Sequence, residues 1–281
     1  MSKKPVRKKV RDIVFCVLSF VLSLLLFLNT VCIFTVAFAV NENAWIDQMN
    51  ASNYFSDKAD EIENKLISLG SASGLEPEFF ENIVDPIQIT NDTQVYMDAY
   101  FHGNDDVIDH SAFRRNFQSQ LERYITEKNV TVNEENVEYL VIEAENIYSA
   151  SLEIPLFHRI SGNMNSLRGI MPVVIAALTM LSLVIVLVLL FGNKWRHRAF
   201  KYYYFACAGT CLSLLAVSVF LTAVGGLKMI ILESRSLYDT AVSFGTSATI
   251  AFWVLTGLFF IISFVMFTIY RSKLSKVYAS D

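Results

Sequence analysis

Residues 170–192 read IMPVVIAALTMLSLVIVLVLLFG, an apolar run without a single charged side chain. About 20 helical residues are enough to cross the roughly 30 Å hydrocarbon core of a bilayer. Three further runs of the same kind lie at 13–40, 203–226 and 241–270. Because a backbone in lipid must satisfy its own hydrogen bonds, each run is predicted to be a helix. The sequence therefore predicts an α-helical integral membrane protein with four transmembrane helices.

The composition of the whole chain agrees with this class of protein. Of 281 residues, 53% are hydrophobic and 18% are charged, and the mean hydropathy is +0.41. Soluble domains carry roughly a quarter of charged residues. These values exclude a disordered chain, an ordinary cytosolic globule and a basic nucleic-acid-binding protein. Membrane lipid is an expected partner, and nucleic acid is not.

Basic residues orient the four predicted helices. Residues 1–11 hold six basic and no acidic residues, residues 193–202 hold four basic residues, and three more follow residue 270. Cytoplasmic flanks of membrane helices retain Lys and Arg. All three segments fall on one side when residues 41–168 lie outside. We therefore expect a multi-pass plasma-membrane protein with both termini in the cytoplasm.

This orientation fixes the predicted order of the segments. They are a basic cytoplasmic N-terminus 1–12, helix 13–40, an extracytoplasmic domain 41–168, helix 170–192, a cytoplasmic loop 193–202, helix 203–226, a short outer loop 227–240, helix 241–270 and a cytoplasmic tail 271–281. The triplet at 37–39, Ala-Phe-Ala, resembles a signal-peptidase site. The apolar run before it is much longer than the 7–15 or so residues of a signal peptide, which favours a retained anchor.

The extracytoplasmic segment 41–168 is predicted to be a mainly helical and strongly acidic domain. It holds 23 acidic and 8 basic residues, a net charge of -15. Phe113, Phe117 and Leu121 recur at the spacing of an amphipathic helix, and Asn133 is a predicted cap for the next one. Val or Ile alternates with a polar residue at 87–89 and 130–132, which leaves a minor sheet open.

Cysteine usage bears on the source of the protein. All four cysteines, at 16, 32, 207 and 211, fall in the predicted spans, and the acidic domain has none. Domains from a disulfide-forming secretory route usually contain an even set, so the protein is expected to be bacterial. Three Asn-x-Ser/Thr triplets, at Asn50, Asn91 and Asn129, keep glycosylation in a eukaryotic host open.

The densest polar stretch of the chain is residues 101–110, FHGNDDVIDH. Its imidazoles and carboxylates are of the types that ligate a divalent cation. The candidate metal ligands are His102, Asp105, Asp106, Asp109 and His110. The alternative is a solvated loop that ends one helix and caps the next. The stretch does not have the spacing of an EF-hand loop, and no HExxH motif occurs in the chain.

Catalysis within the membrane is not expected. A serine such as Ser247 needs a base, but the four apolar runs contain no His, Lys, Asp or Glu. Ion and proton relays generally need such groups as well. Small residues in the last two spans, among them Gly209, Ser218 and Gly257, are predicted to serve close helix packing. We therefore expect no enzyme activity and no cofactor.

The order of spans resembles the layout of FtsX-type membrane subunits, in which a large outer domain follows the first span. That resemblance implies a non-catalytic subunit of a transport or envelope machine with a cytoplasmic ATPase as partner. The cytoplasmic loop at 193–202 is short, so any docking surface for an ATPase is small. We favour a sensor or scaffold whose acidic outer domain binds a protein partner or ligand, since its negative field attracts cationic molecules.

Overall fold

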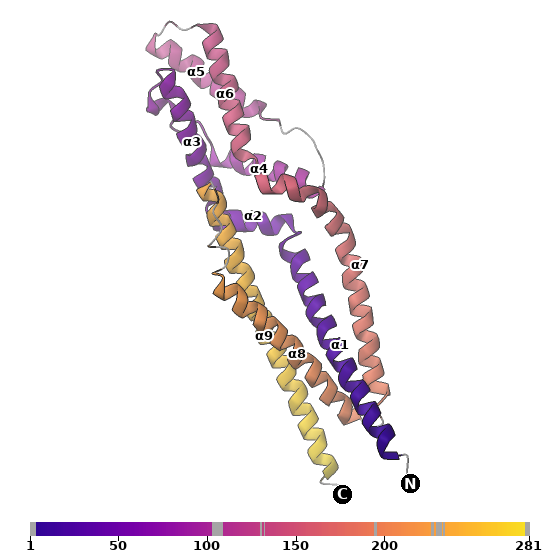
Figure 1. Ribbon diagram of the computed structural model, residues 1–281. Helices are drawn as coiled ribbons and strands as arrows, with labels where there is room; N and C mark the ends of the chain where they lie inside the picture. The colour runs from indigo at the N-terminus through magenta and orange to yellow at the C-terminus, as the bar shows by residue number, and fades with distance from the viewer. Residues whose placement is uncertain are drawn as a thin grey trace. The chain divides into compact units, whose positions relative to one another are not determined.

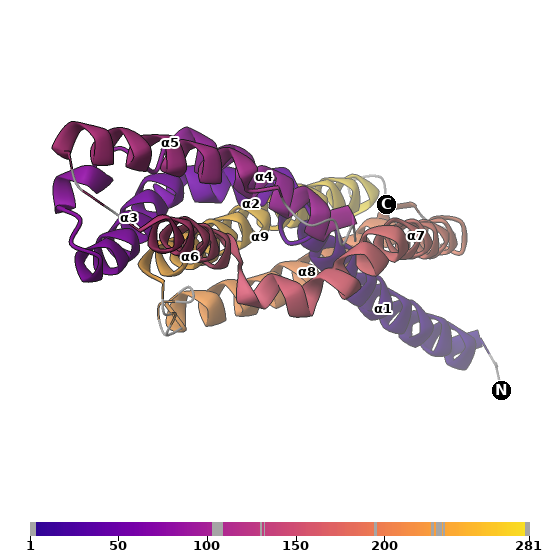
Figure 2. The same cartoon turned by 90° about the horizontal axis from the view of Figure 1, so that it is seen from above.

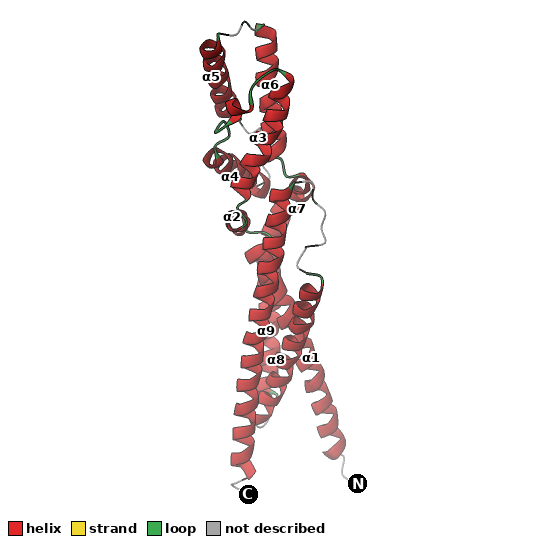
Figure 3. Ribbon diagram, turned by 90° about the vertical axis from the view of Figure 1, so that its left-hand side faces the viewer, coloured by secondary structure: helices red, strands yellow, loops and turns green. Residues whose placement is uncertain are grey.

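The computed structural model of the chain describes residues 4–102, 109–129, 131, 133–193, 196–225, 228, 232 and 234–278. In these residues the secondary structure is helical, and Figure 3 shows no strand among them. The helices are α1 (Lys4–Phe38), α2 (Glu42–Ala51), α3 (Tyr54–Ala72), the 3-10 helix η1 (Pro77–Phe80), α4 (Pro86–His102), α5 (Ser111–Lys128), α6 (Glu134–Leu152), α7 (Pro155–Phe191), α8 (Arg196–Ala223) and α9 (Arg235–Tyr278) (Figure 1).

Four of these helices are long and apolar enough to cross a membrane, as the sequence predicts. The candidate spans are Val10–Phe38, Met164–Phe191, Arg198–Ala223 and Arg235–Ser275. The helices run on past the apolar segments: α7 begins at Pro155, and α9 begins at Arg235. Backbone hydrogen bonds of a helix can continue into the polar sequence beside an apolar run. Proline is well suited to the first position of a helix, which agrees with the start of α7 at Pro155. The side of the membrane that each part faces stays a prediction.

The chain divides into two compact units. The apolar unit consists of Met1–Ala39, Arg168–Met229 and Phe244–Asp281, and the polar unit consists of Val40–Leu167 and Ile230–Ser243. The sequence predicts a separate short outer loop at 227–240. The structure instead groups Ile230–Ser243 with the large polar segment.

Close packing joins α1 and α8 in the apolar unit. The Ser19 hydroxyl donates to the Tyr202 carbonyl over 2.6 Å, and the Thr210 hydroxyl donates to the Ser23 carbonyl over 3.1 Å. A Cβ on Gly209 would lie 2.5 Å from the Ser23 Oγ, so only glycine permits this approach. Predicted small-residue packing is confirmed at Gly209.

Packing between α8 and α9 uses polar side chains of the same kind. Ser218 and Thr256 share a hydrogen bond of 3.1 Å, and the Trp253 indole donates to the Thr222 hydroxyl over 3.1 Å. Gly257, by contrast, has no neighbour within 4 Å of a built Cβ, so the predicted packing role is wrong at that position. Because lipid is as apolar as a leucine side chain, such contacts help helices to select their neighbours.

The polar unit has its own hydrophobic core. Helix α3 packs against α4 and α6, and α5 packs against α6 (Figure 2). The predicted row on α5 is confirmed, because Phe113, Phe117 and Leu121 are all buried. The Phe113 ring stacks on the Tyr148 ring of α6 with centroids 4.1 Å apart. The predicted cap is also confirmed, since the Asn133 side chain accepts a hydrogen bond from the Glu135 N–H.

The possible strand at 87–89 is wrong, because these residues form the first turn of α4. The Asp85 carboxylate accepts the Ile87 N–H over 2.8 Å and thereby satisfies one of the free donors of that turn. Helical capping therefore overrides the β-propensity of Ile87 and Ile89. The second possible strand, 130–132, lies largely outside the described residues, since only Thr131 is described.

Candidate functional site

The structure places the described members of the predicted metal set at two helix ends. His102 is the last residue of α4, whereas Asp109 and His110 directly precede α5. Asp109 accepts hydrogen bonds from the Ser111 N–H over 2.8 Å and from the Ser111 hydroxyl over 3.0 Å. These bonds hold the pKa of Asp109 below its usual range. Asp109 therefore satisfies the first backbone donor of α5 from the position before the N-cap residue His110. Asp105 and Asp106 lie outside the described residues.

His110 contacts the core of the polar unit rather than His102. Its ring meets the Tyr148 ring edge to face, with centroids 5.6 Å apart. The Tyr148 hydroxyl donates to the Asp92 carboxylate over 2.6 Å. Burial, and then this hydrogen bond to a carboxylate, raise the pKa of Tyr148. The Tyr148 phenol therefore stays protonated and links α6 to α4.

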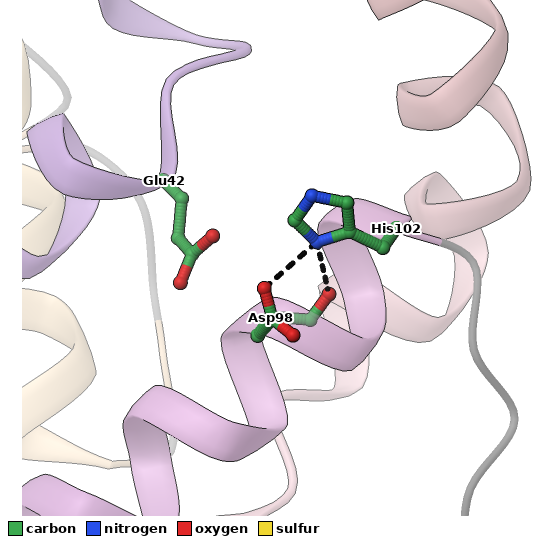
Figure 4. A group of neighbouring side chains, drawn as sticks. All are labelled: Glu42, Asp98 and His102. Atoms are coloured by element: carbon green, nitrogen blue, oxygen red, sulfur yellow. Dashed lines mark hydrogen bonds and ion pairs between the residues drawn. The ribbon is translucent and has the colours of Figure 1, made fainter.

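A different set of potential ligands gathers around His102. Within the described part of the chain, the one cluster of three such side chains consists of Glu42, Asp98 and His102. Their ligand atoms all lie within 4.8 Å of one another. Figure 4 shows the His102 ring above Asp98, with the Glu42 carboxylate reaching toward the pair from the start of α2.

Asp98 holds the imidazole by two contacts. The His102 Nδ1 lies 2.8 Å from Asp98 Oδ1 and 3.0 Å from the Asp98 carbonyl oxygen, as Figure 4 shows. The four-residue spacing puts both side chains on one face of α4. That spacing is visible in the sequence and points to the pair. Glu42 is 56 positions before Asp98, and no sequence pattern connects the two residues.

A buried charged network lies elsewhere in the polar unit, between α3 and the start of α9. The Lys58 ammonium, only 4% exposed as a side chain, lies 3.0 Å from the Glu61 carboxylate. Glu61 also accepts the Ser234 hydroxyl over 2.8 Å and the Ser236 N–H over 2.9 Å. Lys58 donates to the Ser234 hydroxyl over 3.2 Å. We call Lys58, Glu61, Ser234 and Ser236 the α3–α9 network.

The network changes the acidity of both charged groups. Burial alone would raise the pKa of Glu61, but hydrogen bonds from Ser236, Lys58 and Ser234 outweigh it and lower that pKa to about 2. Burial lowers the pKa of Lys58, although Glu61 opposes this effect. The hydrogen bonds thus keep Glu61 ionised. The arrangement fastens residues 234–236 to α3, which is a structural role.

The solvent face of α6 carries an uncommon mixture of side chains. The helix contains five acidic and no basic residues. Its core face buries Leu140, Ala144 and Tyr148. On the opposite face Tyr139 is 63% exposed and Ile142 is 38% exposed. Helical spacing places them beside three exposed acids, and together these residues form the α6 strip: Glu134, Glu135, Glu138, Tyr139 and Ile142.

No family model, curated protein or solved structure matches the chain. The function therefore has to follow from the chain's own residues. The layout shared with FtsX-type subunits, and an ATPase as partner, stay predictions. The absence of enzyme activity stays a prediction as well.

Proposed function

We propose that this protein is a non-enzymatic, membrane-anchored binding protein that serves as a sensor or scaffold. In this proposal the polar unit lies outside the plasma membrane, which we take to be bacterial, and both termini lie in the cytoplasm. The four apolar helices anchor the unit. The partner is a protein that presents a basic amphipathic segment.

The α6 strip carries the proposal. Acidic side chains attract a basic segment from a distance and raise its association rate, while exposed aromatic and aliphatic side chains lengthen the contact. Tyr139 offers a ring face to Lys or Arg, and Ile142 offers an aliphatic surface one turn away. Single exposed apolar side chains are common on protein surfaces. Tyr139 and Ile142 are instead neighbours on an acidic helix face, and apolar side chains that gather on a surface mark an interaction site.

The net negative charge of the polar unit favours a basic binding partner over an acidic one. Residues 41–168 carry a net charge of -15, with 23 acidic and 8 basic residues. The only acid of α6 with a described partner across helices is Glu145, which lies 3.3 Å from Arg114 of α5. The electric field of this net negative charge repels anionic partners and steers cationic ones, most strongly at low salt.

Photo-crosslinking in cells tests the proposed surface. A photoreactive amino acid at Tyr139 or Ile142 should capture a protein, whereas one at Ser119, an exposed residue of α5, should not. Association of the purified captured protein with the full chain in nanodiscs is then measured across a salt series. Replacing Glu134, Glu135 and Glu138 by Gln should slow association about tenfold at low salt, because the local steering charge is removed.

A matched control keeps the same change in net charge but places it elsewhere. The triple variant Glu78→Gln, Glu81→Gln and Glu122→Gln alters three exposed acids outside α6 and should bind at nearly the native rate. Tyr139→Ser should instead raise the dissociation rate, because it removes contact area and no charge. Equal association rates for the two triple variants at every salt concentration refute the α6 strip as the binding surface.

A further inference from the structure

The geometry points to a metal site that is independent of the proposed partner-binding surface: we propose that Glu42, Asp98 and His102 bind a divalent transition-metal ion, with Zn²⁺ as the ion that fits best. The three side chains supply one imidazole and two carboxylates, and their ligand atoms lie within 4.8 Å of one another. Zinc takes nitrogen and oxygen ligands at about 2.0–2.2 Å in four-coordinate sites. Small rotations of the exposed Asp98 and His102 side chains and of the half-buried Glu42 side chain, together with one water, complete such a shell.

The backbone on both sides of the cluster is held in place by the core. Helices α2 and α4 pack against each other. Met49 on α2 is buried, as are Met97 and Phe101, which flank Asp98 and His102 on α4. The Asn41 side chain caps α2 one residue before Glu42. The ligands therefore project from fixed helix ends, and their side-chain torsions supply the adjustment that a metal needs.

The electrostatics of the cluster favour a cation. Two carboxylates surround one imidazole, and the carbonyl oxygen of Asp98 lies 3.0 Å from the ring nitrogen (Figure 4). The pair lies in the last turn of α4, where the helix dipole is negative. His102 already meets two oxygen acceptors through Nδ1. A metal ion satisfies the same acceptors with a larger positive charge.

The ligand types select among metals. Ca²⁺ takes six to eight oxygen ligands, and Mg²⁺ keeps several waters in an octahedral shell of oxygen atoms. A set of three residues that includes an imidazole suits Zn²⁺, Co²⁺ or Ni²⁺ better. The cluster shares only His102 with the five residues predicted from the sequence, so the two sets can be separated by mutation.

The experiment uses the full chain in detergent, freed of metals, and titrates it with Co²⁺ and then with Zn²⁺. Co²⁺ in a protein site gives visible absorption bands, which Zn²⁺ should abolish at one equivalent per chain. His102→Ala and Glu42→Gln should each weaken Zn²⁺ binding at least tenfold, because each removes one of three protein ligands. Asp109→Asn should leave the affinity unchanged, and an asparagine oxygen can still accept the Ser111 N–H at that position.

Asp98→Asn is a second isosteric variant, and circular dichroism confirms that every variant retains the native helix content. The proposal is refuted if Asp109→Asn weakens Zn²⁺ binding while Glu42→Gln does not, since the ion then belongs to residues 102–110. It is also refuted if Mg²⁺ or Ca²⁺ competes with Zn²⁺ at equal concentration, if no saturable binding is found, or if binding survives all the ligand variants. None of these outcomes depends on the α6 strip.

Discussion

Replacing Glu61 by Gln should release the start of α9 from α3. The substitution keeps the shape of the side chain and removes its charge. Lys58 is then left with an ammonium group that is almost fully buried and hydrogen-bonded to the Ser234 hydroxyl. An amide oxygen can still accept the Ser236 N–H, which the native carboxylate accepts over 2.9 Å. The change therefore isolates the charge of Glu61.

The size of the effect follows from the burial of the two partners. Removing one partner of a buried ion pair costs about 3–5 kcal/mol. We take the lower value, about 3 kcal/mol, because the Glu61 side chain is 23% exposed and water can reach the site. This corresponds to a change of roughly 100-fold in the local opening equilibrium, since about 1.4 kcal/mol is tenfold.

Hydrogen–deuterium exchange of the full chain in detergent measures this opening directly. The protection factors of the amides of residues 234–240 should fall roughly 100-fold, while the protection factors of the amides of α5 should not change. Lys58→Met should lower the free energy of local opening by only about 1 kcal/mol, less than Glu61→Gln does. In this variant Glu61 keeps its hydrogen bonds to Ser234 and Ser236 and its access to water. Asp60→Asn, an exposed change on the same helix, is the matched control.

The order of the two variants is the decisive result. If Lys58→Met costs as much as Glu61→Gln, the energy lies in packing and not in the buried charge. If Glu61→Gln alters protection less than twofold, the α3–α9 network does not hold residues 234–240. Either result refutes the reasoning.

The acidity of Glu61 gives the same network a defined pH dependence. Its pKa is about 2 in the folded protein against an ordinary value of 4.5. A carboxylate with a lowered pKa stabilises the fold fully above its unfolded value, and that contribution is lost as the pH falls through the folded value. The thermal midpoint of the native chain should therefore fall between pH 4.5 and pH 2, and Glu61→Gln should reduce that fall.

Two further predictions concern helix packing in the apolar unit and the orientation of the chain in the membrane. Gly209→Ala should lower the thermal midpoint by several degrees, because its Cβ would press on Ser23, whereas Gly257→Ala should be nearly neutral. In a chain whose native cysteines are replaced, a cysteine at Ser119 should react in intact cells with a membrane-impermeant thiol reagent, and one at Ser275 should not. Labelling at Ser275 alone reverses the predicted orientation.

Much of the fold could be predicted because its signals are local. Four charge-free runs indicate four helices long enough for a bilayer, and the spacing of Phe113, Phe117 and Leu121 identifies a buried face. Asn133 is recognisable as a cap because the acceptor and donor are two residues apart. Periodicity and capping act within a single helix, so a sequence is sufficient to find them.

The candidate metal site could be predicted only in part. The density of imidazole and carboxylate groups in residues 101–110 predicts His102 as a metal ligand. The structure pairs it instead with Asp98, four residues earlier, and brings Glu42 from another helix. The contact with Glu42 depends on how α2 packs against α4, and packing between helices leaves no regular spacing in the sequence.

The α3–α9 network likewise depends on packing between segments that are distant in the sequence. Lys58 and Glu61 are three residues apart, as many surface ion pairs on helices are. Arg235 and Asp239 form such a surface pair, 3.7 Å apart and with the arginine side chain 87% exposed. Exposed pairs of this kind contribute little to stability. Lys58 differs because Ser234 and Ser236, about 175 residues away in the chain, cover its pair with Glu61 and complete the hydrogen bonds. Burial by a distant segment, which no spacing in the sequence records, therefore turns an ordinary helical pair into a buried contact between α3 and residues 234–236.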